Sequence, residues 1–419
     1  MESEDVRSHL YEPTSSETEE NVSKAYLIKD HKANAAQTLP IKRDHCRRSE
    51  WWLAAAIFSI LLVVILFLRH KDCVCGCGRK LEGHKPMKSL GGELHCDAEV
   101  MKPSLKIPEN VNKVRPADRK VIAAMGNSIT VAARSKNFEE EHDWSLYPGN
   151  SYISGGDGSL QEQITIGKVL REFNHEILGL SYGIDYKNTG FNVAVSGMTS
   201  EDIPRQASDL ITRLKQKGIS LTEDWKLVSI FFGTNDLGKL RCTIDKEPVS
   251  REDYKANLVK AISLLRENLN RTIISIIPMW NSQLTIDARS LILEGKRLQC
   301  GDHYMEKRDI LCGEYRKVAY EIQNERMFDD EDFTVVVQGF MDEIVDAFRN
   351  KDGVYDKSFY ATDMFHLSKY GNAVVGKFLW NAMLTPVGNK TTRINLGDDS
   401  VPLRCPTKER PYIQTLNNS

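Results

Sequence analysis

The longest uninterrupted apolar segment of the chain is residues 51–68, WWLAAAIFSILLVVILFL, which contains no charged side chain. As a helix it would be about 27 Å long, close to the roughly 30 Å of a bilayer's hydrocarbon core. Polar residues precede it, whereas a cleavable signal peptide begins near the N-terminus. A buried core helix is the alternative, but a run that is apolar on every side and has basic flanks favours a membrane. The pattern predicts one transmembrane helix.

Farther along, from about residue 119, short apolar and β-branched runs alternate with amphipathic stretches. The runs predict strands at 120–126, 191–197, 226–233, 272–278 and 333–340. The amphipathic stretches predict helices at 200–217, 251–269, 308–327 and 368–384. Near-continuous apolar strands separated by helices indicate a parallel sheet covered on both faces. In such sheets functional sites form at the carboxyl ends of the strands.

These patterns divide the chain into four parts. Residues 1–50 are polar without periodicity and are predicted to be a disordered cytoplasmic tail, in which Cys46 is a free thiol or, alternatively, acylated. Residues 51–68 are the anchor, and residues 69–117 form a Lys-, Gly- and Cys-rich stem. Its CVCGCG run could bind a metal, but zinc spacing is lacking, so disulfides or a flexible stem are favoured. Residues 118–419 form the α/β domain.

The orientation of the anchor follows from cysteine usage rather than from charge. Residues 31–50 carry five Lys/Arg and residues 69–88 carry six, so the positive-inside rule does not decide. Eight of the nine cysteines follow the anchor, and an even number on one side suits an oxidising compartment. Sequons at Asn270, Asn389 and Asn417 agree. We therefore expect a single-pass type II membrane glycoprotein with disulfides, its N-terminus cytoplasmic and its C-terminal domain extracellular or lumenal.

Composition excludes several classes of protein. The chain has 56 Lys+Arg against 58 Asp+Glu and 41% hydrophobic residues, which is typical of a folded protein. A nucleic-acid-binding protein would show a basic excess or stripe, so no nucleic-acid partner is expected. There is no HExxH, no phosphate-binding Walker loop and no pair of CxxC sites, so neither a metal nor an organic cofactor is expected.

Three predicted strands end in residues suited to acyl-transfer chemistry. Ser128 follows the first strand, where a strand-to-helix turn can expose both its hydroxyl and its backbone N–H. Gly197 follows the second and offers an unobstructed backbone N–H, and Asn235 follows the third and offers an amide donor. Taken singly, these residues are more simply a helix cap, a turn glycine and a turn asparagine. Their order along the chain is what indicates a site.

A histidine and an aspartate lie near the C-terminus, in the sequence Asp363-Met364-Phe365-His366. A histidine base needs an acceptor on its second ring nitrogen, which fixes the tautomer and stabilises the imidazolium. An aspartate three residues upstream can supply that acceptor. A lone histidine is more often structural, but here it completes a set of serine, glycine, asparagine and Asp-x-x-His.

These blocks resemble those of the SGNH (GDSL-type) hydrolases, a family of serine esterases and lipases. More closely, the chain resembles the membrane-associated phospholipase B group of animals. The similar text spans about residues 96–419 and includes VRPADRKVIAAMGNSIT, SYISGGDG, AVSGMTSEDIPRQA, EDWKLVSIFFGTNDL and CPTKERPYIQTLNNS. The resemblance implies a flavodoxin-like three-layer α/β/α sandwich with a central parallel sheet.

The resemblance also implies a role for each residue of the set. Ser128 is the expected nucleophile, and Asp363 and His366 complete the triad. The expected oxyanion donors are the backbone N–H groups of Ser128 and Gly197 and the side chain of Asn235. The implied reaction is attack of the serine on an ester carbonyl, followed by hydrolysis of an acyl-enzyme.

The chain departs from the family pattern at three positions of these blocks. The family usually has Asp where Asn127 stands, a second glycine where Thr234 stands, and a cysteine where Gly238 stands. The first change removes a charge beside the serine, and the last leaves the pairing of Cys242, Cys300 and Cys312 open. Residues 131–150 are also more charged than the resemblance leads one to expect.

Three functions remain open from the sequence. The first is a membrane-anchored esterase or lipase acting on fatty-acyl esters of phospholipids or lysophospholipids. The second is a catalytically weakened family member that acts as a surface binding protein, which the changes at Asn127 and Thr234 motivate. The third is a short-acyl, carbohydrate esterase, because a fold does not fix a substrate.

Overall fold

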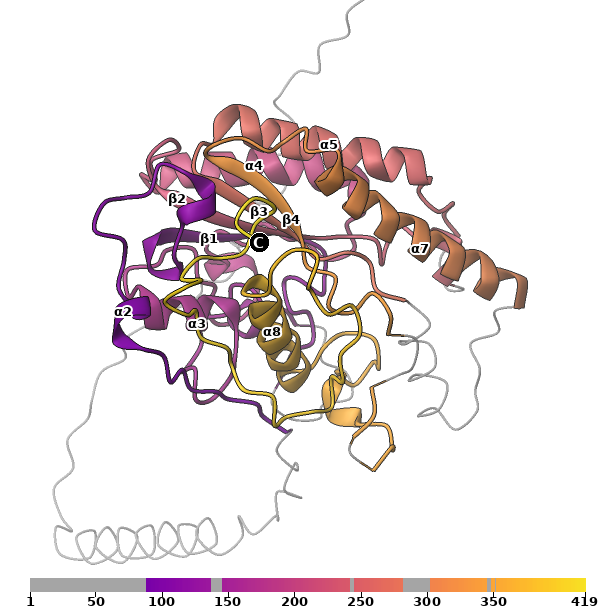
Figure 1. Cartoon of the computed structure of the whole chain (residues 1–419). Helices are drawn as coiled ribbons and strands as arrows, with labels where there is room; N and C mark the ends of the chain where they lie inside the picture. The colour runs from indigo at the N-terminus through magenta and orange to yellow at the C-terminus, as the bar shows by residue number, and fades with distance from the viewer. Residues whose placement is uncertain (1–87, 137–144, 242–244, 282–301, 345–347, 351) are drawn as a thin grey trace, which may run out of the picture. The chain divides into compact units, whose positions relative to one another are not determined.

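The computed structural model describes residues 88–136, 145–241, 245–281, 302–344, 348–350 and 352–419 (Figure 1). The chain divides into two units, Met1–Lys80 and Leu81–Ser419, and every described residue belongs to the second. Within the described ranges, no helix has the length and apolar character needed to cross a bilayer. The predicted tail 1–50, the anchor 51–68 and the first part of the stem lie outside these ranges.

A parallel sheet of four strands forms the centre of the second unit, in the order β1-β2-β3-β4. The strands are β1 (Arg119–Gly126), β2 (Trp225–Phe231), β3 (Thr272–Ile276) and β4 (Phe333–Val337). Adjacent strands pair in register, for example Ile122 with Leu227 and Leu227 with Ile273. Nearly every strand residue is buried, as expected of a sheet covered on both faces. Four of the five predicted strands are thereby confirmed.

The one predicted strand that is not confirmed, 191–197, does not form a regular strand. It runs beside β1, where Val193 N donates to Ala124 O (2.9 Å) and Val195 N to Gly126 O (3.2 Å), but it forms only one isolated bridge. The ladder breaks at Gly126, whose N–H donates to Gln206 Oε1 (2.8 Å) instead of to this segment. The buried Asn192 side chain accepts from Ala194 N and donates to Thr130 O. If this segment is counted as the second of five, the strand order is 2-1-3-4-5, as in flavodoxin-like sheets.

That order places a topological switch point beside β1, because the chain leaves β1 toward one side and returns to β2 on the other. Crevices for ligands form at such points, outside the carboxyl ends of the strands. The residues that follow β1 and β2 are therefore the first place to look for a site.

Helices lie on both faces of the sheet (Figure 1). One face carries α4 (Ile203–Gln216), α5 (Arg251–Asn268) and α7 (Asp302–Asn324), and the other carries α3 (Ile166–Phe173) and α8 (Lys369–Met383). The four predicted helices are confirmed. Three differ by at most three residues at either end, whereas α7 begins six residues before the predicted start at 308. α3 is additional. Among the helices of the described ranges, α2 is short (Ala98–Met101). Short 3₁₀ turns occur at Val111–Lys113, Pro116–Asp118, Pro148–Asn150, Tyr186–Asn188, Ser200–Asp202, Gly238–Arg241 and Lys357–Phe359.

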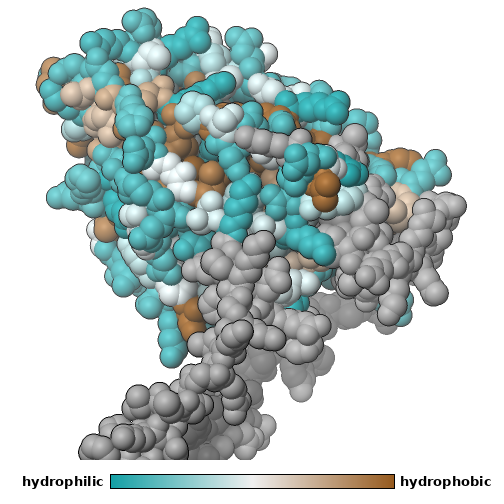
Figure 2. Space-filling model, turned by 90° about the horizontal axis from the view of Figure 1, so that it is seen from below, coloured by the Kyte–Doolittle hydropathy of each residue, from teal (hydrophilic) through white to brown (hydrophobic). Residues whose placement is uncertain are grey.

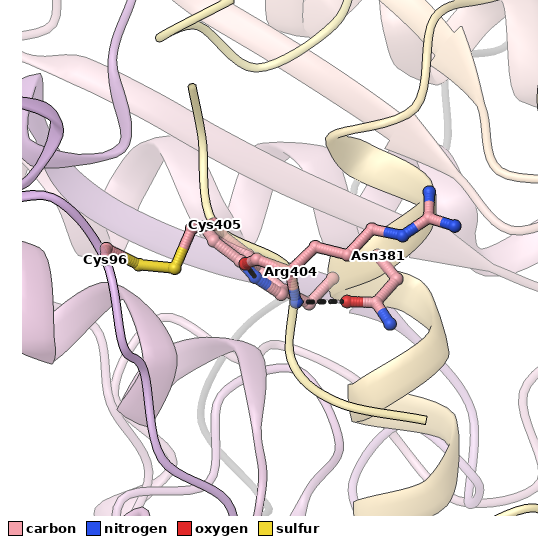
Figure 3. The surroundings of a disulfide bond; sticks show 5 residues. Cys96, Asn381, Arg404 and Cys405 are labelled. Carbon is pink, nitrogen blue, oxygen red and sulfur yellow. Dashed lines mark hydrogen bonds between the residues drawn. A yellow bond between two sulfur atoms is a disulfide. The ribbon is translucent and has the colours of Figure 1, made fainter. Parts of the chain in front are cut away.

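The last part of the expected stem, residues 88–117, packs on the α/β domain. Gly92 N donates to Leu160 O and Ile164 N to Leu90 O, both at 3.0 Å. A disulfide joins Cys96 to Cys405 (Figure 3). The boundary expected at 117 therefore falls inside a continuous folded unit, because apolar side chains on both sides of it share one core.

The surface seen in Figure 2 is mainly hydrophilic, and its hydrophobic residues are interspersed among polar ones. Scattered exposed apolar side chains are normal for a folded domain. This face gives no reason to place a site on it, and the switch point remains the best candidate.

Candidate active site

Ser128 lies in the turn that follows β1 and is 4% exposed. Glycine is required two positions before it, because a Cβ on Gly126 would lie 2.2 Å from Thr130 Oγ1 and 3.0 Å from Phe231 O. The buried Gln206 of α4 accepts from Gly126 N and donates to Gly126 O, both at 2.8 Å. This double hydrogen bond fixes the end of β1. Within the described chain, the backbone N–H of Ser128 has no acceptor.

Gly197 is exposed and has a φ of +83°, a conformation that side-chain-bearing residues rarely adopt. A Cβ would meet no atom within 4 Å, so backbone conformation rather than crowding explains the glycine. No acceptor among the described residues takes the hydrogen bond of its N–H. Like the N–H of Ser128, it is available to a ligand.

Asn235 follows β2 and is held at both ends of its amide. Its Nδ2 donates to Met198 O (2.9 Å), and its Oδ1 accepts from Arg241 Nη1 (2.7 Å). An amide nitrogen carries two hydrogens, so one remains for a ligand. The bond to Met198 joins this loop to the segment that contains Gly197.

A second link between these two loops involves Asp236, which is fully buried. Its Oδ1 accepts from Ser200 N at 2.8 Å. Burial raises the pKa of the Asp236 carboxyl to about 6, although the hydrogen bonds from Ser200 oppose this. The loops after β1 and β2 and the segment 197–200 thus form one connected assembly.

Asp363 and His366 form a close pair, with His366 Nδ1 2.6 Å from Asp363 Oδ2. Met364 adopts a positive φ of +54°, and this turn lets Asp363 Oδ1 accept from the backbone N of Phe365 (3.1 Å) and of His366 (3.0 Å). The aspartate therefore orients both the ring and the loop that carries it. Ser368, the N-cap of α8, accepts from Gly371 N and ties the loop to that helix.

The charge of Asp363 follows from its surroundings. Burial raises the pKa of this carboxyl, but the hydrogen bond and positive charge of His366 lower it, as do the backbone N–H groups of His366 and Phe365. The lowering effects dominate, so the net pKa lies below the usual range. Asp363 is therefore ionised at neutral pH and accepts hydrogen bonds only.

Two arginines connect the histidine loop to the other parts of the site. Arg134 Nη1 lies 3.4 Å from Asp363 Oδ2 and comes from the segment after Ser128. Arg241, which binds Asn235, lies with its guanidinium 4.9 Å from the centre of the Phe365 ring. That ring packs edge-on against the ring of His366, 4.9 Å between centroids. The contacts thus connect the loops of Asn235, His366 and Ser128.

One expected contact is not formed. In the described part of the chain, Ser128 and His366 share no hydrogen bond. Catalytic hydrogen bonds are often long in proteins without substrate and tighten when the substrate binds. The structure therefore brings Asp363 and His366 together, and it joins Asn235 to the segment that contains Gly197. Ser128 and His366 are not joined by a direct hydrogen bond in the described chain.

Residues that sequence reasoning did not single out hold these groups in place: Gln206, Arg134, Asp236 and Arg241. Gln206 carried a signal, because it is a polar residue on the apolar face of a predicted helix. Asp236 follows Asn235 directly in the sequence. The two arginines carried no sequence signal, since each acts on a partner that only the fold brings near.

Residues 122–379 match the profile of the family described as GDSL-like Lipase/Acylhydrolase. The chain is 33% identical over 336 residues to "Phospholipase B1, membrane-associated" of Homo sapiens, and 33% over 345 residues to that of Rattus norvegicus. These alignments cover 76% and 80% of this chain but only 22% and 23% of the relatives' own lengths.

Similar solved structures include a GDSL-like lipase from Parabacteroides merdae, titled putative, and the acetylxylan esterase Axe2 from Geobacillus stearothermophilus. Each is 15% identical and aligns with 63% of this chain, covering 95% and 93% of those chains, with TM-scores of 0.37 and 0.33. The sequence match extends from β1 into α8 and so includes Ser128, Gly197, Asn235, Asp363 and His366. Because that match covers more than half of the chain, this protein belongs to the GDSL-like lipase/acylhydrolase family.

Proposed function

We propose that the protein is a serine hydrolase of carboxylic esters, with Ser128, His366 and Asp363 as its triad. The observation that carries this proposal is the 2.6 Å contact between His366 Nδ1 and Asp363 Oδ2. Because the ionised Asp363 can only accept, Nδ1 must carry the proton, which leaves the lone pair of Nε2 free to act as a base.

The reaction then proceeds in two halves. Ser128 Oγ attacks the ester carbonyl carbon while His366 Nε2 takes the hydroxyl proton. The carbon–oxygen bond to the alcohol breaks, and the departing oxygen receives that proton from His366. A water molecule, deprotonated in turn by His366, attacks the acyl-enzyme, releases the carboxylic acid and returns the proton to Ser128.

Three donors would stabilise the negative charge on the carbonyl oxygen in each half. The N–H groups of Ser128 and Gly197 have no acceptor in the described chain, and Asn235 keeps one amide hydrogen after its bond to Met198. Loss of one such donor typically lowers turnover by about 10²–10³-fold. Free donors at the end of a sheet support acyl transfer better than they support a binding protein.

The substrate class that we propose is fatty-acyl esters of phospholipids or lysophospholipids. The human and rat relatives at 33% identity carry the name membrane-associated phospholipase B1, which motivates this choice. A short-acyl carbohydrate esterase and a weakened binding protein are the alternatives that the experiment must separate.

The test is covalent labelling of the full-length protein by a fluorophosphonate probe, beside Ser128→Ala, His366→Ala and the control Ser196→Ala. Ser196 is an exposed serine next to Gly197. We expect Ser128→Ala to abolish labelling, His366→Ala to weaken it strongly, and Ser196→Ala to leave it unchanged. Absence of labelling in a folded wild-type protein would favour the binding protein, and hydrolysis of acetyl esters alone would favour the short-acyl esterase.

We also propose that residues 51–68 anchor the protein as a type II membrane protein with the domain outside the cytoplasm. The Cys96–Cys405 disulfide supports an oxidising compartment. Asn389 is exposed, whereas Asn270 is half-buried and its Nδ2 donates to Asp332 Oδ2 (2.7 Å). Asn389→Gln should therefore remove a glycosidase-sensitive increase in mass and Asn270→Gln should not. A wild-type protein without any glycan would contradict this placement.

A further inference from the structure

A cavity of about 370 Å³ lies on the α8 side of the sheet, beyond the carboxyl ends of β3 and β4. Its walls come from the segments after these strands, from α8, from the neighbouring 3₁₀ turn Lys357–Phe359 and from residues 393–397 (Figure 1). Many of the lining residues are apolar and buried, with Trp280, Phe348, Val375 and Leu396 among them. Sites for small molecules typically occupy about 300–1,000 Å³, so this cavity is suited to one slender apolar group.

The cavity adjoins the proposed base. Phe365 and Leu367, which flank His366 in the sequence, both line it. The Phe365 ring also packs edge-on against the His366 ring, at 4.9 Å between centroids. The Phe365 ring therefore contacts both the cavity and the ring of the proposed base.

The outer part of the cavity is cationic. Arg349 and Arg393 line it, and among its described lining residues there is no Asp or Glu. Arg349 is held in place, because its Nη1 donates to Gly353 O (2.8 Å) and its Nη2 to Tyr355 Oη (2.9 Å). Arg393 is exposed. Buried apolar walls below an exposed cationic rim match an amphiphile with one hydrocarbon chain and an anionic head.

We propose that this cavity binds the acyl chain of an anionic lysophospholipid, with its phosphate at the rim beside Arg393 and its ester beside Phe365. The proposal rests on the ester hydrolase function above and assigns the residues that select its substrate. Guanidinium groups pair well with phosphate oxygens, and burial of each methylene of the chain adds binding energy. The apolar walls of the cavity therefore select the length of the acyl chain, and Arg393 selects the charge of the head group.

The first test fills the cavity with Ile394→Trp in the full-length protein. Ile394 lines the cavity and is half-buried. The matched control is Val401→Trp, because Val401 is also half-buried in the C-terminal segment but does not line the cavity. We expect Ile394→Trp to lower kcat/KM for a C16 lysophosphatidylglycerol at least tenfold and to change that for p-nitrophenyl acetate less than twofold. Equal loss on both esters, or no loss on either in a folded variant, would overturn the proposal.

The second test removes the exposed charge with Arg393→Ala, a surface change that should not affect folding. We expect kcat/KM to fall several-fold for lysophosphatidylglycerol and to stay constant for a monoacylglycerol of the same chain length, which lacks phosphate. An equal effect on the two lipids would overturn the role of Arg393.

A binding experiment separates this inference from the proposed function. Displacement of a fluorescent fatty acid by C16 lysophosphatidylglycerol is measured on Ser128→Ala alone and combined with Ile394→Trp or Arg393→Ala. Binding that weakens in both combinations supports the cavity even where the wild-type protein proves to have no esterase activity. Binding that is unchanged in both overturns the cavity proposal even where esterase activity is present.

Discussion

The Asn127 amide donates a hydrogen bond from Nδ2 to the Thr234 hydroxyl, 2.8 Å away, and so joins the ends of β1 and β2 directly beside Ser128. Asn127 is fully buried and Thr234 is 4% exposed. These are two of the positions at which the chain departs from the family pattern of Asp and Gly. An asparagine brings an amide donor that a carboxylate lacks, and a glycine at 234 would leave that donor without this acceptor. The two departures therefore form one coupled pair.

This coupling predicts that Thr234→Val is destabilising. The change keeps the side-chain shape but leaves Asn127 Nδ2 buried without its acceptor, which typically costs about 1–3 kcal/mol. In an Asn127→Ala background the same change should cost much less, because the donor is absent. Urea unfolding of the wild type, the two single variants and the double variant measures the coupling. Additive effects would show that the hydrogen bond contributes nothing specific.

The strands and helices could be predicted where burial makes the pattern continuous. β1 to β4 consist almost wholly of buried residues, and the four predicted helices have clear apolar faces or caps such as Ser250 and Ser368. The prediction of a strand at 191–197 was wrong because the N–H of Gly126, which a regular ladder would pair with this segment, donates to the Gln206 side chain of α4 instead. α3 was not predicted, although Ile166, Val169, Leu170 and Phe173 stand at helical spacing after the N-cap Thr165 and carry a helical signal.

Arg241 supplies a second prediction, because it fixes the orientation of the Asn235 amide. With Oδ1 held by the guanidinium at 2.7 Å, Nδ2 must face Met198 and the segment of Gly197. Arg241→Met keeps much of the aliphatic stem but loses this donor, so the amide can rotate. We expect kcat to fall about tenfold to a hundredfold, less than the 10²–10³ typical of complete loss of an oxyanion donor, with KM changed little.

The control for Arg241→Met is Lys239→Met, which lies on the same 3₁₀ turn but pairs with Glu247. Arg241→Lys retains a donor and should recover part of the lost kcat. A parallel rise in KM with kcat intact, or an equal loss in the Lys239 variant, would argue that the arginine only supports the loop.

Residues that position others, such as Arg241, mark the limit of what the sequence can predict about this site. Ser128 and Asn235 follow strands, Gly197 ends the irregular segment beside β1, and His366 precedes a helix. At such positions residue type alone suggests chemistry. The partner of an arginine depends on folding instead: Arg134 reaches Asp363 across 229 positions, and Arg241 reaches Phe365 from another loop. Local pattern carries no information about contacts at that range.

Asp236 leads to a prediction about pH. Burial raises the pKa of its carboxyl from 3.8 to about 6 in the folded protein. Between about pH 4 and 6 the unfolded chain has released this proton while the folded protein still holds it. The contribution of this group is therefore fully present below pH 4 and is lost as the pH rises through 6. A shift of about two pKa units corresponds to about 3 kcal/mol.

Asp236→Asn should abolish this loss, because an asparagine has no proton to release and its Oδ1 can still accept from Ser200 N. Urea unfolding from pH 4 to 7 should show a stability advantage of the variant that grows across the interval toward about 3 kcal/mol. The control Glu252→Gln, which changes an exposed carboxylate, should follow the wild type. A constant difference between Asp236→Asn and wild type at all pH values would contradict the buried titration.

The disulfide between Cys96 and Cys405 leads to the last prediction. It links residues 309 positions apart. Arg404, directly before Cys405, is also held by hydrogen bonds, from its N to Asn381 Oδ1 (2.9 Å) and from Trp380 Nε1 to its O (2.8 Å) (Figure 3). After Cys405, Gln414 N donates to Met383 O (2.9 Å). Because these bonds remain in the reduced protein, loss of the disulfide should lower global stability rather than detach the C-terminal segment. Native disulfides typically contribute about 2–5 kcal/mol, mainly by restricting the unfolded chain. Cys96→Ser/Cys405→Ser should therefore lower Tm by several degrees while esterase activity at 25 °C persists. A double variant as stable as the oxidised wild type would show that the link contributes nothing.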